Sequence, residues 1–288
     1  MKAHLVLLLY CLAVVQCDYG DLDGAENFGS GDFEWNEMRE QCPGRAQSPI
    51  ALDTYATVLG VERRPLELLG YQENPSQVVV TNNGYLAVYT FEYPNGQVIT
   101  ARGGPLRGTF QFDSLHFHWG EDSDRGAEHV VDGRRYAMEM HLVFYNTMYG
   151  SFMGARNQTN GLAVLGIFFN STNTDVNYGW IPALSEVRTA GTSYTLPDPT
   201  VFNIKGLIGA RRRPYYSYHG SLTTPPCFET VTWLVQRKPL PISEEQLDYF
   251  RSLRDGNGNP LVDNYRELQP INGRTVYFYP SDFRTRGK

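Results

Sequence analysis

"FDSLHFHWG", residues 112–120, places two histidines two positions apart inside an apolar stretch. Side chains alternate between the two faces of a β-strand, so His116 and His118 are expected on one face, about 7 Å apart along the strand. Phe117 and Trp119 then point to the opposite face, into packing. A histidine pair on one strand face is either a polar interruption of a core strand or part of a metal site, and the spacing alone leaves both interpretations open.

Strand patterns dominate the chain of 288 residues, whose hydrophobic content of 41% suffices for one large core. Residues 76–91 form two apolar runs around Asn83-Gly84, which predicts a β-hairpin because this dipeptide suits positive backbone angles. Residues 161–169 and 229–236 are apolar on both strand faces, as in central strands. We therefore predict a mostly β fold with a large twisted, mainly antiparallel central sheet and short peripheral helices.

The clearest helix pattern covers residues 243–255, with Ser243 as the N-cap and apolar residues on one face. We interpret residues 35–282 as one domain, because no linker or repeat divides them. The glycine-rich, acidic residues 18–34 are predicted to form an extended arm, and residues 283–288 a polar tail.

The first 17 residues have the pattern of a secretory signal peptide. An apolar run over residues 5–15 follows Lys2 and is too short to span a bilayer, with cleavage expected near Cys17. We therefore expect a secreted, extracellular protein without a membrane anchor. Residues 18–40 hold eight acidic residues and one basic residue, which nearly accounts for the net charge of −6. This charge argues against a nucleic-acid partner, and a solvated leader is a simpler interpretation than contact with cations or a matrix.

The chain beyond the signal peptide keeps two cysteines, Cys42 and Cys227. In an oxidising compartment they either form one disulfide or stay as two buried thiols. Two Asn-x-Ser/Thr triplets, at Asn157 and Asn170, are expected glycosylation sites, although such triplets also arise by chance.

A third histidine strengthens the metal interpretation. His141 lies in "MEMHLVF" between Met140 and Leu142, so it is expected to face inward as well. Three inward histidines on neighbouring strands can bind Zn²⁺ and leave a fourth position open for water. Glu139 lies on the same strand face as His141 and is expected to accept a hydrogen bond from a metal-bound imidazole, since it would otherwise be an unexplained buried acid.

At this point several segments resemble the α-class carbonic anhydrases, in order and near the usual spacing. The resemblance covers about residues 35–280 and includes "QSPI", "GGPLRGTFQFDSLHFHWG", "GAEHVVDGRRYAMEMHLVFYN", "NGLAVLGIFF", "YHGSLTTPPCFETVTW" and "VDNYRELQP". It implies that fold, a Zn²⁺ cofactor and the reversible hydration of carbon dioxide to bicarbonate and a proton. The attack is made by zinc-bound hydroxide in this family, with weak esterase activity as a side reaction.

The resemblance also implies residue roles. His116, His118 and His141 match the three zinc ligands. Thr223 matches the threonine that accepts a hydrogen bond from the zinc-bound hydroxide, and Glu128 matches the acid that receives that threonine's proton. The remaining matches line the carbon dioxide and bicarbonate positions: Thr224, Val143, Val164, Leu222, Val231 and Trp233.

Two positions depart from the family pattern and one pair agrees with its secreted members. Tyr85 stands where the fastest members have a proton-carrying histidine, and an unperturbed tyrosine titrates near 10, so we expect moderate turnover. Ser114 stands where the family often has a glutamine bonded to the first zinc histidine. The shorter serine is expected either to act through water or to weaken zinc binding or tilt the His116 ring, without removing a ligand. Cys42 and Cys227 match the disulfide of secreted members.

Two other classes of function compete with this interpretation. A zinc-bearing scaffold or matrix protein without catalysis is one, but inactive relatives typically lose a zinc histidine, and all three are present here. A zinc hydrolase acting on esters or peptides is the other. The apolar pocket argues against it, and the chain contains no His-Glu-x-x-His motif.

Overall fold

The computed structural model places the predicted sheet and its surroundings, whereas the predicted signal peptide, acidic arm and polar tail lie outside the described residues. The boundaries of the single domain therefore stay a prediction. The structure describes residues 42–62, 64–173, 176–202, 204–208 and 214–280.

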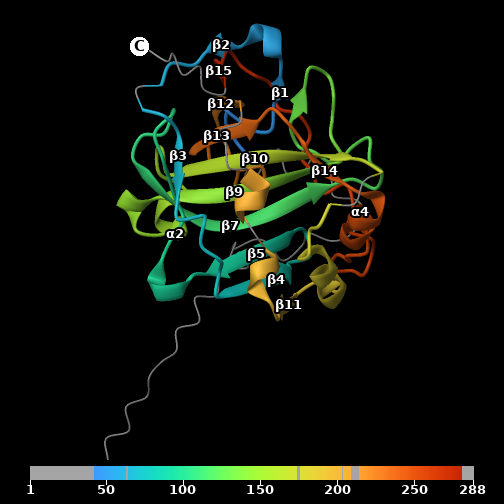
Figure 1. Ribbon diagram of the computed structural model, residues 1–288. Coiled ribbons are helices and arrows are strands. Elements are labelled where there is room, and N and C mark those ends of the chain that lie inside the picture. Colours follow the sequence, from blue (N-terminus) through green and yellow to red (C-terminus); the bar gives the residue numbers. More distant parts are fainter. Residues whose placement is uncertain (1–41, 63, 174–175, 203, 209–213, 281–288) are drawn as a thin grey trace, which may run out of the picture.

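Thirteen strands of the described chain form one twisted sheet (Figure 1). Its main path runs through β11 (Thr192–Thr195), β4 (Gln77–Asn82), β5 (Ala87–Glu92), β7 (Thr109–Trp119), β9 (Met138–Asn146), β10 (Leu162–Ser171), β13 (Val231–Gln236), β12 (Tyr215–Gly220), β15 (Tyr277–Tyr279) and β2 (Val58–Leu59). Three strands pair beside this path: β3 (Glu67–Leu69), β6 (Thr100–Arg102) and β14 (Leu240–Ile242). A separate ribbon pairs β1 (Ala51–Leu52) with β8 (Val130–Val131).

Most neighbouring strands of the large sheet are antiparallel, and two of its three parallel pairs involve β10. This strand is antiparallel to β9 but parallel to β13 and to β14. Strands β15 and β2 also pair in parallel. The sheet is therefore mixed but mainly antiparallel, which confirms the predicted fold class. The continuous apolar runs predicted as central strands correspond to β10 and β13, both of which have neighbours on each side.

Short helices surround the sheet. The predicted helix is present as α4 (Glu244–Arg251), shorter than its sequence pattern, and it buries Leu247 and Phe250. It begins with a capping box, in which the Ser243 hydroxyl accepts from Gln246 N and the Gln246 side chain accepts from Ser243 N. The other helical segments in the described residues are α2 (Phe152–Ala155), α3 (Ile204–Ile208), and the 3₁₀ turns η2 (Thr54–Ala56), η3 (Pro94–Gly96), η4 (Thr147–Tyr149), η5 (Ile181–Val187) and η6 (Pro199–Val201).

The predicted hairpin joins β4 to β5, with Asn82 opposite Ala87 at its end. Of the predicted Asn83-Gly84 pair, only Gly84 has a positive φ, at 90°. Asn83 stabilises the turn with its side chain, because its Oδ1 accepts from the backbone N–H groups of Tyr85 and Leu86 at 3.0 and 2.8 Å.

Strand β7 separates two apolar clusters by its alternating side chains. Phe117 and Trp119 are fully buried in the larger cluster, together with Phe250 of α4. His116 and His118, which alternate with them, face the other side of the sheet, where a smaller cluster contains Val143 and Trp233. The predicted division of β7 into a core face and a histidine face is therefore confirmed, and the histidine face belongs to the smaller cluster.

Candidate metal centre and active site

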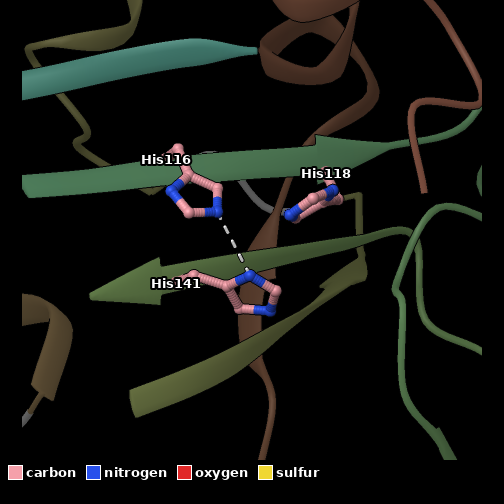
Figure 2. A group of neighbouring side chains, drawn as sticks. All are labelled: His116, His118 and His141. Atoms are coloured by element: carbon pink, nitrogen blue, oxygen red, sulfur yellow. Dashed lines mark hydrogen bonds between the residues drawn. The ribbon is translucent and has the colours of Figure 1, made fainter. Parts of the chain in front are cut away.

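Three histidines converge on one face of two paired strands (Figure 2). His116 and His118 come from β7, and His141 comes from β9, directly opposite His116 in the strand register. Their ring centroids lie 4.7 to 5.2 Å apart, and their exposed fractions are 7%, 1% and 1%. One nitrogen from each ring lies within 4.8 Å of the others. The strand register therefore assembles the predicted triad.

The triad has the spacing that zinc requires, and burial favours the metal-binding form of two of its rings. His141 Nδ1 lies 3.3 Å from His116 Nε2, and His118 Nε2 is buried without a hydrogen-bond partner among the described residues. Tetrahedral zinc with bonds of 2.0–2.1 Å separates two ligand nitrogens by about 3.3 Å. Burial lowers the pKa of His116 and of His118, which favours the neutral imidazole that binds metal. These residues fit a Zn²⁺ ion.

The second ring nitrogens of two ligands have partners that determine their tautomers. His118 Nδ1 donates to the backbone carbonyl of Asn264 at 2.8 Å, and His141 Nε2 donates to Glu139 Oε1 at 2.9 Å. The lone pairs of His118 Nε2 and His141 Nδ1 then remain available for the metal. Such bonds also hold each ring in its orientation. Glu139 therefore lies where the sequence pattern expects it.

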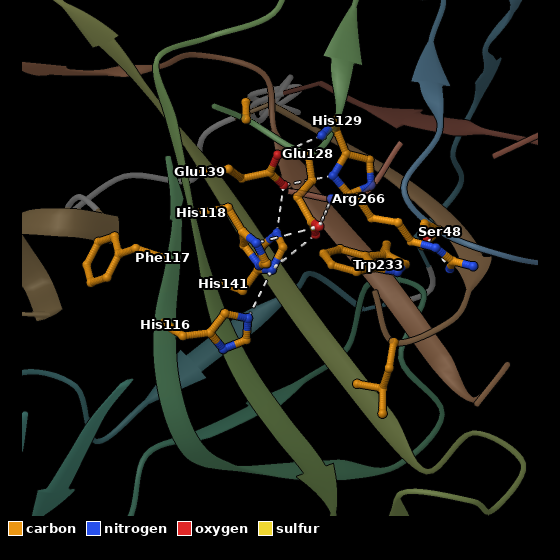
Figure 3. A network of polar contacts seen from close by, with 12 residues as sticks. Ser48, His116, Phe117, His118, Glu128, His129, Glu139, His141, Trp233 and Arg266 are labelled. Carbon is orange, nitrogen blue, oxygen red and sulfur yellow. Dashed lines mark hydrogen bonds and ion pairs between the residues drawn. The ribbon is translucent and has the colours of Figure 1, made fainter. Parts of the chain in front are cut away.

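Glu139 belongs to a longer buried network (Figure 3). Its Oε1 lies 2.7 Å from His129 Nδ1, and its Oε2 accepts from His129 N at 2.8 Å. Burial would raise the pKa of Glu139, but His129 and His141 together hold it well below its usual value. His129 Nε2 lies 2.7 Å from the Tyr218 hydroxyl, which donates to Ser48 Oγ at 2.8 Å. A charged carboxylate is thus held behind the triad.

Glu128 lies beside the triad with only one of its oxygens bonded. Its Oε1 accepts from the backbone N–H of Arg266 at 2.9 Å. Its Oε2 is buried without a hydrogen-bond partner among the described residues and lies 3.9 Å from His141 Nδ1. Thr223 is buried on the loop that follows β12, and Thr224 is half-buried next to it. The site therefore contains a carboxylate oxygen that can accept one further bond.

An apolar wall adjoins the triad. Val143 of β9 pairs with Val164 of β10, which in turn pairs with Trp233 of β13. The Trp233 ring centroid lies 4.8 Å from that of His141. Val231 is buried in the same cluster, and Leu222 packs against it. All five residues that the family resemblance assigns to the carbon dioxide wall therefore lie in one apolar cluster at the metal centre.

The predicted disulfide between Cys42 and Cys227 is present, with an S–S distance of 2.02 Å. Cys227 N donates to the carbonyl of Thr224 at 3.0 Å, and the carbonyl of Cys227 accepts from Gln47 Nε2 at 3.1 Å. The disulfide therefore joins the start of the described chain to the loop that carries Thr223.

The remaining predicted positions differ in burial, from the interior to the surface. Tyr85 is half-buried after the hairpin turn, and its carbonyl accepts from Asn264 Nδ2 at 2.9 Å. Ser114 is fully buried on the histidine face of β7. Asn157 is exposed just after α2, and Asn170 is half-buried near the end of β10.

Sequence reasoning missed several residues that organise the centre. His129 follows Glu128 directly in the sequence, but its hydrogen bonds to Glu139 become apparent only in the folded structure. Asn264 contacts His118 through its carbonyl and Trp119 N through Oδ1, although Asn264 and Trp119 are separated by 145 positions in the sequence. A Cβ at Gly166 would lie 3.0 Å from Glu139 Oε1, so this glycine makes room for the carboxylate. Only the isolated glycine in an apolar strand was a signal in the sequence.

A large mixed sheet with a buried three-histidine centre beside an apolar wall defines a zinc-dependent enzyme of carbonic anhydrase type. The family profile of the eukaryotic-type carbonic anhydrases matches residues 30–280. Carbonic anhydrase 7 of Mus musculus is 37% identical over 264 residues, which cover 90% of this chain and 95% of the relative.

Two further relatives agree. Carbonic anhydrase 7 of Homo sapiens is 38% identical over 252 residues, covering 85% of this chain and 93% of the relative. Carbonic anhydrase 6 of Mus musculus is 35% identical over 258 residues, covering 86% and 78%. The chain belongs to the eukaryotic-type carbonic anhydrases, so the predicted family and the predicted zinc enzyme, a carbonate dehydratase, are confirmed. In the described part of the chain, no helix has the length and apolar character needed to cross a membrane.

Proposed function

We propose that the chain hydrates carbon dioxide reversibly to bicarbonate and a proton at the His116, His118 and His141 centre, with moderate turnover. The observation that carries this proposal is the buried three-histidine triad beside an apolar wall. When bound, zinc lowers the pKa of a water ligand to about 7, an effect for which the carbonic anhydrases are the standard example. A nucleophile is then available at neutral pH.

The apolar wall receives the substrate in this proposal. Carbon dioxide is uncharged and linear, so Val143, Val164 and Trp233 can hold it by packing without losing hydrogen bonds. The same side chains keep bulk water away from the reacting carbon. Because Trp233 contacts the His141 ring, the wall lies directly beside the metal centre.

Thr223 and Glu128 orient the reacting oxygen. Glu128 Oε1 is occupied by Arg266 N, whereas the buried Oε2 is free and would be costly to leave unpaired. We assign this oxygen as the acceptor for the Thr223 hydroxyl proton. The Thr223 oxygen can then only accept from the reacting group, which favours a single orientation of that group. Thr224 lies next in the chain and lines the bicarbonate position.

The proton route is the slow part of the proposed cycle. Tyr85 holds the position that a histidine occupies in the fastest relatives, and a tyrosine with its ordinary pKa near 10 releases and accepts protons poorly at neutral pH. Small buffer molecules are therefore expected to take part in proton transfer. This is the reason for the proposed moderate turnover.

We also propose that the mature chain is secreted. The apolar leader over residues 5–15 and the disulfide between Cys42 and Cys227 both suit an oxidising route. Exposed Asn157 and half-buried Asn170 are the proposed glycan sites. The acidic arm is proposed to remain a solvated leader, and matrix or cation contact through it is the weaker alternative.

Zinc analysis combined with a stopped-flow hydration assay tests the proposal. The wild-type chain is expected to hold one zinc ion and to hydrate carbon dioxide, and His141→Ala is expected to lose both. His219→Ala is the matched control, because His219 is exposed and lies outside the triad. Stoichiometric zinc without hydration would instead support a zinc-bearing scaffold protein.

A further inference from the structure

The three zinc ligands are not equally supported. His118 and His141 each donate from their second ring nitrogen, to Asn264 and to Glu139 respectively. His116 Nδ1 is also buried but has no hydrogen-bond partner among the described residues. Its Nε2 faces His141 Nδ1 at 3.3 Å, so Nδ1 is the nitrogen that points away from the metal position.

Ser114 lies on the same face of β7, two positions before His116. It is fully buried, yet its hydroxyl donates to Asp113 Oδ2 at 3.0 Å. Asp113 is the extra residue of a β-bulge, because the register between β7 and β9 shifts between Phe112 and Ser114. The bulge therefore provides the carboxylate that accepts the hydrogen bond of the Ser114 hydroxyl.

We propose that Ser114, bonded to Asp113, makes His116 the weakest-held ligand and so lowers the retention of zinc. A partner on the second ring nitrogen fixes the orientation of the imidazole and raises its basicity, and such a partner is typically worth 10–100-fold in metal affinity. A triad with two supported ligands of three should therefore release zinc about tenfold faster than one with three. This inference rests on the metal centre and not on the proposed proton route.

The test compares zinc release from the full-length, zinc-loaded chain to an excess of chelator at one fixed neutral pH. Ser114→Gln introduces an amide oxygen that can accept from His116 Nδ1–H, and Ser114→Met has nearly the same size without an acceptor. We expect release from the Gln variant to be about tenfold slower than from the Met variant and the wild type.

A second pair and a second readout cover the chance that a long side chain disrupts the buried strand. Ser114→Asn and Ser114→Leu form a shorter matched pair, with slower release expected from Asn. Nuclear magnetic resonance of isotope-labelled histidine should also show the His116 ring N–H shifted downfield in the amide variant of whichever pair folds. Equal release rates within that pair would overturn the proposal, even if the ring N–H does become bonded.

Discussion

Glu139 Oε1 accepts a hydrogen bond from His141 Nε2 at 2.9 Å, and the other nitrogen of that ring lies 3.3 Å from His116 Nε2. The carboxylate thus sets the tautomer of a ligand from behind the metal position. Its two oxygens also contact His129, at 2.7 and 2.8 Å. An amide has only one acceptor oxygen and cannot satisfy all three contacts.

We therefore predict that Glu139→Gln lowers zinc affinity by about 10–100-fold. Chelator competition with the purified chain measures this directly. Glu67→Gln is a suitable control, since Glu67 is exposed on β3 and its carboxylate forms an exposed ion pair with Arg102. Equal affinities for zinc in the two variants would contradict a role for Glu139 in holding the ligand.

Replacement of Tyr85, at the proposed proton-carrying position, should change turnover in dilute buffer. Tyr85→His introduces a side chain that titrates near neutral pH, and it is expected to raise kcat while leaving kcat/KM close to wild type. Tyr85→Phe should give no gain. Stopped-flow hydration with and without added imidazole checks this, because added buffer should erase the difference. A wild-type kcat for the His variant in dilute buffer would refute the assignment.

Loss of the disulfide should destabilise the chain. Cys42 and Cys227 are separated by 185 positions, so their bond closes a very long loop. Removing such a native bond typically costs about 2–5 kcal/mol, and we expect this loss in the free energy of unfolding of Cys42→Ser/Cys227→Ser. Urea unfolding measures it, and wild type under reducing conditions should match the variant. Identical midpoints for the oxidised wild type and the variant would show that the bond contributes nothing.

Tyr89 should respond to mutation in the opposite way from Tyr218. The Tyr89 hydroxyl is buried without a hydrogen-bond partner among the described residues, so Tyr89→Phe is expected to raise the free energy of unfolding by about 1 kcal/mol at neutral pH. The Tyr218 hydroxyl contacts His129 and Ser48, so Tyr218→Phe should cost about 1–3 kcal/mol. Denaturant unfolding of the two variants provides the comparison.

The benefit of Tyr89→Phe should grow with pH. Burial raises the pKa of Tyr89 well above 10, whereas the unfolded chain ionises this phenol near 10. The stabilisation from the neutral folded tyrosine is therefore complete below pH 10 and is lost as pH rises above it. The gap between variant and wild type should widen in that alkaline range, and a gap independent of pH would contradict the predicted shift.

Local patterns predicted much of the fold because they depend on neighbouring residues. Alternation along β7 separated the histidine face from the Phe117 face, and the apolar runs at β10 and β13 indicated central strands. The hairpin was also predicted correctly, although only Gly84 adopts the expected positive φ. The helix pattern extended beyond the end of α4, because its last apolar position packs in the core without continuing the helix.

The sequence by itself determined the three histidines, their strand faces and the family, since these depend on residue type and on spacing within short segments. Only the tertiary structure decided which ring nitrogen of each histidine faces the metal position. For His118 that choice follows from a bond to Asn264, far along the chain. At His116 no such bond forms among the described residues, because Ser114 beside the bulge bonds to Asp113 instead. Hydrogen bonds of this kind need atoms placed within about 3 Å, which strand periodicity cannot specify.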